Sequence, residues 1–305
     1  MDSEPTAALR DAPLEVKLKI MLRNWSYPEF REILYREAKE GKDHKEASVY
    51  KRTYAYLRAL ELHRAGYGEV RKIIRDEVGY MPSKGLLRQW LRGRSSPLTR
   101  MAVFDVHLPE VGLIMGLVLS DGYRGECYYK GHFRGVRVDF FNKDESLLEM
   151  FREACRRLNL AVWRLQCKQP DFGWLKTSSV LLYLLLRRFE DFIVKAPANV
   201  QWAFIKGLML GDGWIGEYVQ FCNTDPSIIR TVSALLKMYR IKHSVRGPYP
   251  RKDLRRKPVY SIHIRQQSRE RFLRLTRLAE SPPHPFPAIS SLLIPYLELI
   301  DPTSE

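Results

Sequence analysis

Long apolar runs are absent from this 305-residue chain. The longest, such as residues 180–186, fall far short of the roughly 20 residues that a helix needs to cross a bilayer. The opening stretch MDSEPTAALRDAP is acidic and contains no apolar core, which argues against a secretory signal. We therefore expect an intracellular protein, cytoplasmic or in an organelle, with no membrane partner.

Cysteine is also scarce and scattered. The four cysteines form no CxxC pair and have no histidines at finger spacing, which excludes a zinc ribbon and a disulfide framework. The four are Cys127, Cys155, Cys167 and Cys222.

Acidic residues are too few to balance the basic ones. Lys and Arg number 51 against 35 Asp and Glu, which gives a formal net charge of +16. Such an excess favours a polyanionic partner, with nucleic acid ahead of an anionic membrane. A basic protein without such a partner is the alternative.

The sequence contains an internal repeat. Residues 112–122 read GLIMGLVLSDG and are followed by FFNKDESLLEMFREACRRLNL, whereas 203–213 read AFIKGLMLGDG and are followed by FCNTDPSIIRTVSALLKMYRI. The follow-on segments align without a gap, and in each an Asp two residues after an Asn is placed to cap a helix. Each half then reads helix, hairpin, helix, hairpin, helix. Two such halves predict an α+β fold of two pseudo-twofold related αββαββα repeats.

Small residues recur at helical spacing just before each Asp-Gly. The first stripe is Gly112, Gly116 and Ser120, and the second is Ala203, Gly207 and Gly211. Glycine inside a helix costs about 1 kcal/mol relative to alanine, so two in one helix indicate close packing on that face. We expect the stripes to pack on each other, which would make neighbours of the acids that end the two helices.

Those two acids, Asp121 and Asp212, would meet at the negative ends of two helix dipoles, an arrangement that is unfavourable unless a cation is bound. Carboxylates, carbonyls of the last helical turn and water are the ligands that Mg²⁺ prefers. We therefore expect a divalent cation such as Mg²⁺ at the helix ends, with Ser120 and Gly211 completing the donor set.

These motifs resemble the LAGLIDADG homing endonucleases of the single-chain, two-motif kind. The signature helices are MGLVLSDG (115–122) and KGLMLGDG (206–213), and the resemblance covers roughly residues 104–280. It implies that Asp121 and Asp212 bind two or more divalent ions and that a monomer hydrolyses one phosphodiester in each strand of its DNA target, as in intron homing. Basic residues near the cleft are also implied. We assign this role to Lys176 and Arg265, which we expect at matching places before the third helix of each repeat.

Strand alternation selects the side chains expected to read the DNA major groove or to grip its phosphates. The second repeat has a shorter first hairpin, since Asp212 and Asn223 are only 11 positions apart against 21 for Asp121 and Asn142. The basic loop 251–257 in that half is expected to compensate. The candidates in the two repeats are Arg137, Asp139, Arg164, Gln166, Lys168, Gln220, Arg246, Arg251, Lys252, Arg255, Arg256 and His263.

An all-helical domain precedes the repeats. We divide the chain into a helical domain (1–100), a first repeat (104–195), a second repeat (196–280) and a tail (281–305). Residues 67–97 have the pattern of a helix-turn-helix, in which Gly79 ends one helix and Ser83 caps the next. Lys84, Arg88 and Arg92 of the second helix would then contact DNA.

Two other functions are compatible with the same fold. One is an RNA maturase that assists splicing of its host intron RNA. The other is a regulator that binds DNA without cutting it, although retention of both acids argues against it.

Overall fold

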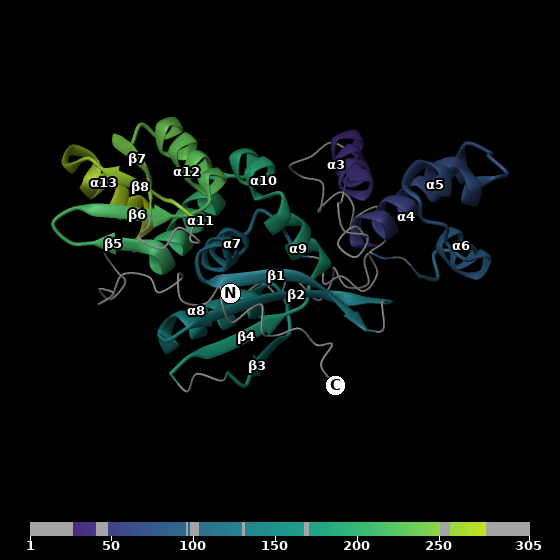
Figure 1. Cartoon of the computed structure of the whole chain (residues 1–305), viewed down its shortest axis with the longest axis horizontal. Coiled ribbons are helices and arrows are strands. Elements are labelled where there is room, and N and C mark those ends of the chain that lie inside the picture. Colours follow the sequence, from purple (N-terminus) through teal and green to yellow (C-terminus); the bar gives the residue numbers. More distant parts are fainter. Residues whose placement is uncertain are drawn as a thin grey trace, which may run out of the picture.

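The structure is a computed structural model that describes residues 27–40, 48–95, 97, 104–129, 132–167, 171–250 and 257–278. These residues form a helical module followed by two repeats of mixed helix and sheet (Figure 1). None of the helices described has the length and hydrophobicity needed to cross a bilayer. All four cysteines are free thiols, in keeping with the absence of a disulfide pattern.

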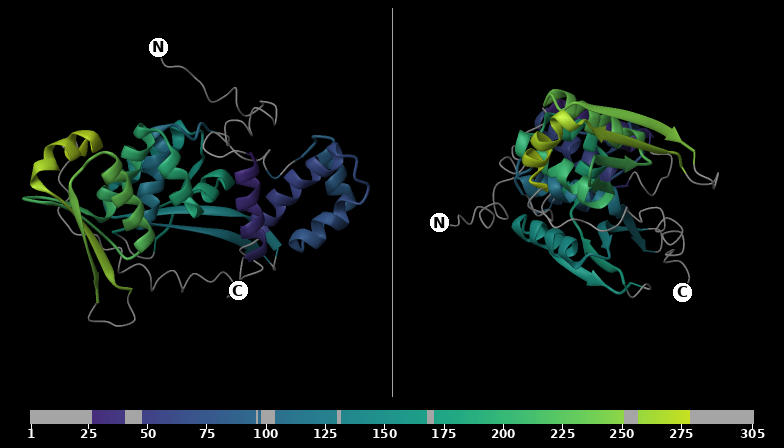
Figure 2. Two further views of the ribbon diagram at one scale, coloured as in Figure 1. Left: turned by 90° about the horizontal axis from the view of Figure 1, so that it is seen from above. Right: turned by 90° about the vertical axis from the view of Figure 1, so that its left-hand side faces the viewer.

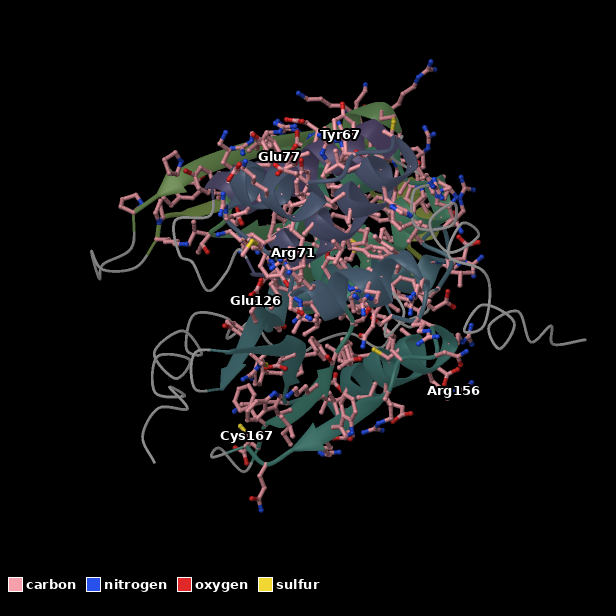
Figure 3. All side chains as sticks on the ribbon, turned by 90° about the vertical axis from the view of Figure 1, so that its right-hand side faces the viewer. Tyr67, Arg71, Glu77, Glu126, Arg156 and Cys167 are labelled. Atoms are coloured by element: carbon pink, nitrogen blue, oxygen red, sulfur yellow. The ribbon has the colours of Figure 1, made fainter. Side chains whose placement is uncertain are left out.

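Among its described residues the module contains α3 (Tyr27–Glu40), α4 (Ser48–Arg64), α5 (Val70–Val78) and α6 (Lys84–Leu91). The predicted boundaries of its last two helices are confirmed. Gly79 ends α5 in the left-handed conformation, and the Ser83 hydroxyl accepts the N–H of Leu86 at 3.1 Å to cap α6. Trp90 is buried against the edge of Tyr56, which fixes α6 on α4. Figure 3 views the molecule from the side of this module, with Tyr67 and Glu77 near its top.

The first repeat begins with α7 (Pro109–Asp121) and continues with β1 (Gly122–Tyr129), β2 (His132–Asn142), α8 (Glu145–Arg157), β3 (Val162–Leu165), β4 (Gly173–Thr177), α9 (Val180–Arg187) and α10 (Phe189–Lys195). Its antiparallel sheet has the strand order β1-β2-β4-β3. Val138, Phe140 and Leu175 are fully buried on the face covered by α8 and α9. The inward positions predicted from the alternation in β2 are therefore confirmed.

The second repeat has the same order as far as its third helix: α11 (Ala198–Asp212), β5 (Gly213–Ile215), β6 (Val219–Asn223), α12 (Pro226–Met238), β7 (His243–Tyr249), β8 (Val259–Ile264) and α13 (Gln266–Thr276). The strand order β5-β6-β8-β7 repeats that of the first sheet. Its first hairpin is much shorter, as predicted, whereas β7 and β8 form a long hairpin that projects from the body (Figure 2). The molecule thus has two αββαββα repeats, as the sequence predicts.

Helices α7 and α11 pack side by side in the centre of the molecule, between the two sheets (Figure 1). A Cβ atom added to Gly207 would lie 2.5 Å from the carbonyl oxygen of Leu113 and 2.9 Å from Cα of Gly116. Conversely, a Cβ atom on Gly116 would lie 2.8 Å from Cα of Gly207. The two small-residue stripes therefore meet backbone to backbone, as the spacing predicts.

Candidate functional site

The two signature acids lie at the adjoining ends of the central helices. Asp121 is the last residue of α7 and Asp212 the last residue of α11. A Cβ atom on Gly211 would come within 2.9 Å of the Asp121 carboxylate and would also overlap the side chain of Ser120. Since Gly211 directly precedes Asp212, the packing brings both acids to one place, as expected.

The glycines after the two acids are required by close approach rather than by an unusual backbone angle. Gly122 and Gly213 have extended, negative φ values and begin β1 and β5. A Cβ atom on Gly122 would lie 2.5 Å from the carbonyl oxygen of Asp139, and one on Gly213 would lie 2.8 Å from Cα of Met209. Each Asp-Gly pair therefore turns the chain from a helix into the first strand of a sheet without space for a side chain.

Each acid is held by an asparagine from the second strand of its own repeat. Asn142 donates from Nδ2 to Oδ2 of Asp121 at 3.3 Å, and Asn223 donates to Oδ2 of Asp212 at 2.7 Å. Sequence reasoning used both asparagines only as landmarks of the repeat and assigned them no role. Their recurrence before a capping Asp in both copies was the signal that could have identified them.

A further hydrogen bond fixes each asparagine to the helix that follows it. The Oδ1 atoms of Asn142 and Asn223 accept the backbone N–H of Asp144 and Asp225, at 2.9 Å and 2.7 Å. Asp144 caps α8 and Asp225 caps α12, as the sequence predicts. The acids are therefore positioned by hydrogen bonds that reach the second helix of each repeat.

The carboxyl group of Asp121 lies in a poorly hydrated environment. Burial raises the pKa of Asp121 from 3.8 to about 7, because little water remains to stabilise the carboxylate. Asp212 is buried, whereas Asp121 as a whole residue is half-buried. No cluster of three or more His, Cys, Asp and Glu suited to a metal occurs in the described part of the chain. A metal at the helix ends would take two carboxylates, carbonyls that lack helical partners and water, a set that suits Mg²⁺.

A row of side chains crosses each sheet two residues beyond each acid, on the face opposite the covering helices. In the first sheet the row is Tyr123, Asp139, Lys176 and Trp163, paired strand to strand. In the second sheet it is Trp214, Gln220, His263 and Ser244. We call these the first row and the second row.

The rows correct one expectation. Lys176 has His263 as its counterpart in the second repeat, and not Arg265. Arg265 is exposed and lies at the N-cap of α13. The prediction was wrong because it took Arg265 as part of the last strand, whereas β8 ends at Ile264 and the register pairs His263 with Gln220 as it pairs Lys176 with Asp139. Burial lowers the pKa of His263, and the charges of Arg246 and Arg265 lower it further.

Asp139 is not an exposed side chain, contrary to the prediction. It is fully buried on the open face of β2, where Arg137 forms an ion pair with it. Burial raises the pKa of Asp139, although Arg137 and Lys176 oppose this shift. Strand alternation identified the correct face, but it could not show that neighbouring side chains cover the carboxylate.

Arg164 lies on the opposite face from the one predicted. It pairs in register with buried Leu175 and forms hydrogen bonds of 2.6 Å and 3.0 Å with Glu145 of α8. Trp163 occupies the open face instead and is 49% exposed. On this short edge strand apolar residues occupy both faces, so alternation gave the wrong parity. Gln166 is exposed beyond the end of β3.

Several predicted contacts lie on the open face of the second sheet, and others cannot be placed. Gln220 and His263 belong to the second row, and Arg246 is exposed opposite Ser261. Five candidates fall outside the described residues: Lys168, Arg251, Lys252, Arg255 and Arg256. In the helical module, Lys84, Arg88 and Arg92 are all exposed on or directly after α6.

Comparisons with known proteins give distant relatives. No protein-family model matches the chain. A DNA polymerase of Thermococcus litoralis is 23% identical over 158 residues, 48% of this chain, but the chain spans only 9% of the polymerase. The crystal structure of I-DmoI in complex with DNA and calcium is 23% identical with a TM-score of 0.47, and the match covers 61% of this chain and 97% of that one. The homing endonuclease I-WcaI bound to its DNA recognition sequence is 12% identical with a TM-score of 0.38, covering 67% and 92%.

Proposed function

We propose that this chain is a site-specific, Mg²⁺-dependent endonuclease that cuts both strands of duplex DNA, of the LAGLIDADG intron-homing type. The observation that carries the proposal is the meeting of Asp121 and Asp212 at the ends of two glycine-packed helices. A chain with both acids has a complete site, so we propose that it acts as a monomer. Cleavage of two strands by one such site accounts for the pseudo-twofold repeat.

The metal, held by the carboxylates of Asp121 and Asp212 and by the Ser120 and Gly211 carbonyls, would supply charge stabilisation and activation of water. The protein's own contribution is to fix the donors. Asn142 and Asn223 keep one oxygen of each carboxylate oriented, and the glycine seam prevents the two helix ends from separating. The carboxylates are thereby held in place before DNA or metal arrives.

Lys176 is the proposed cationic residue of the first half-site. Its ammonium lies beside Asp139 in the first row and can neutralise charge on a phosphate that approaches this face. His263 takes the corresponding place in the second row. Because burial and two arginines lower the pKa of His263, its contribution at neutral pH is hydrogen bonding rather than charge. The two DNA strands would thus meet chemically different groups, the ammonium of Lys176 in one half-site and the neutral imidazole of His263 in the other.

The duplex is proposed to lie along the open faces of both sheets. Arg137, Gln220, Arg246 and His263 provide groups that can hydrogen-bond to base edges or phosphates. The exposed basic residues of α6 would contact the same duplex beyond the sheets, as the second helix of a helix-turn-helix does. These contacts give affinity without requiring the metal.

The proposal is tested with the Asp121→Asn and Asp212→Asn variants. A duplex library with a randomised central segment is incubated with the wild-type chain and Mg²⁺, and cleaved products are sequenced. Each variant should lose cleavage of the recovered target while binding it with unchanged affinity, since removal of a carboxylate affects the metal site alone. Undiminished cleavage by either variant would refute the site. Sequence-specific binding by a wild-type chain that never cleaves would support the regulator instead.

A further inference from the structure

Arg137 is held in an unusually rigid environment on the open face of the first sheet. Its guanidinium lies 5.3 Å from the ring centre of Tyr123 and 5.5 Å from that of Trp174. Nε and Nη2 both donate to Oδ2 of Asp139, the former at 2.7 Å. The Arg137 side chain nevertheless remains 20% exposed, whereas Asp139 is fully buried. An arginine fixed by two rings and a buried carboxylate has already lost most of its conformational freedom.

The ion pair uses only one edge of the guanidinium. Nε and the adjacent Nη2 face Asp139, and no hydrogen bond from Nη1 occurs among the described residues. The remaining edge, formed by Nη1 and the outer N–H of Nη2, has two parallel donors. This geometry matches the O6 and N7 acceptors that guanine presents in the major groove.

We propose that Arg137 is the specificity-determining residue of the first sheet and reads one guanine in the half-site that this sheet faces. This inference rests on the proposed function, because it requires a duplex on the open face. Asp139 acts as a positioning residue: it orients the arginine and does not itself contact a base. The Arg137 side chain loses its conformational entropy when the protein folds and not when DNA binds. The free energy of the guanine contact is therefore not reduced by that loss.

The second sheet has no equivalent arrangement. Register places Gln220 where the first sheet has Asp139 and Ser261 where it has Trp174. Tyr218, in the turn two residues before Gln220, corresponds by count to Arg137. None of these groups carries a fixed charge. We therefore expect an asymmetric target, in which the base pair read by Arg137 has no counterpart read by an arginine held in the same way at the matching register position of the second sheet.

The test compares base preferences of three variants with the wild-type chain. Duplexes are selected from the randomised library by binding in Ca²⁺, and the recovered target is then varied one base pair at a time. In the wild-type chain, changing the required G·C pair should weaken binding about 5- to 150-fold. Arg137→Gln should equalise the four base pairs at that position alone. Asp139→Asn, which keeps the shape but removes the charge, should reduce the same preference without weakening binding overall.

Arg156→Gln is the matched control, because Arg156 is an exposed arginine of α8, on the covered side of the first sheet, and forms an ion pair with Glu153. It should leave the guanine preference intact. Equal weakening at every position by Arg137→Gln, with a lowered unfolding temperature, would show a purely structural role and overturn the inference. A wild-type selection that enriches no sequence would instead overturn the proposed function.

Discussion

Asn223 donates a hydrogen bond from Nδ2 to Oδ2 of Asp212 at 2.7 Å, while its own Oδ1 accepts the N–H of Asp225. The amide thus connects the end of the central helix α11 to the start of α12. Asn142 makes the same pair of bonds in the first repeat. In both repeats this contact fixes the orientation of the carboxylate, which an acid at a helix end without such a partner would lack.

Asn223→Ala should lower cleavage about 10- to 100-fold, because loss of a group that orients a metal ligand typically has this effect. DNA affinity should not change. The measurement is single-turnover cleavage together with equilibrium binding of the same duplex. Asn199→Ala is the control, since Asn199 is exposed at the opposite end of α11. Equal cleavage by the two variants would show that the amide does not position Asp212.

Gly207→Ala should destabilise the fold by about 1–3 kcal/mol, the usual cost of inserting a methyl group where the core has no space. Gly85→Ala is the matched control, because Gly85 also lies in a helix but has no atom within 4 Å of an added Cβ. That change should stabilise by about 0.5–1 kcal/mol. Urea unfolding of both variants measures the difference. A neutral Gly207→Ala would mean that the helix seam is not close-packed.

The parts of the molecule that the sequence predicts well are those set by local patterns. The stripe with Gly116, the stripe with Gly207 and the caps Asp144 and Asp225 all follow from helical spacing and from the chemistry of helix ends. The proximity of the two acids follows from these same features, once the internal repeat is recognised.

The features that sequence reasoning missed depend on tertiary contacts. Arg164 faces α8 because Glu145 provides a partner there, and the sequence of a four-residue edge strand does not reveal this. Lys176 corresponds to His263 through strand register, which a count of residues cannot establish when connections differ in length. Asp139 is buried on the open face of β2, where Arg137 forms an ion pair with it.

The metal-free protein should lose stability as the pH rises from about 4 to about 7. Burial raises the folded-state pKa of Asp121 from 3.8 to about 7. The contribution of Asp121 to the free energy of unfolding is therefore fully present below about pH 4 and is lost as the pH rises to about 7. Asp121→Asn should therefore be more stable than the wild-type chain at pH 8 without metal. The measurement is the unfolding temperature of both proteins at pH 4 and pH 8.

Mg²⁺ should reverse this loss in the wild-type chain, because a bound cation favours the ionised carboxylate. The stabilisation by Mg²⁺ should be larger at pH 8 than at pH 5 and should be smaller in Asp121→Asn. Equal stabilisation of both proteins at both pH values would indicate that the cation binds elsewhere.

Lys176→Met should lower cleavage about 100-fold, the usual effect of removing one group that stabilises developing charge. Arg265→Met should have little effect, since Arg265 lies outside the first and second rows. The readout is strand-resolved cleavage of a doubly end-labelled duplex, in which Lys176→Met should slow one strand more than the other. Equal slowing by both variants would contradict the correspondence of Lys176 with His263.

The central claim is that Asp121 and Asp212 share one metal centre at the helix ends. Anomalous scattering from crystals of the wild-type chain grown with Mn²⁺, a common substitute for Mg²⁺, tests it directly. We expect peaks within coordination distance of both carboxylates. Anomalous peaks confined to other parts of the molecule, with both carboxylates unliganded, would contradict the account.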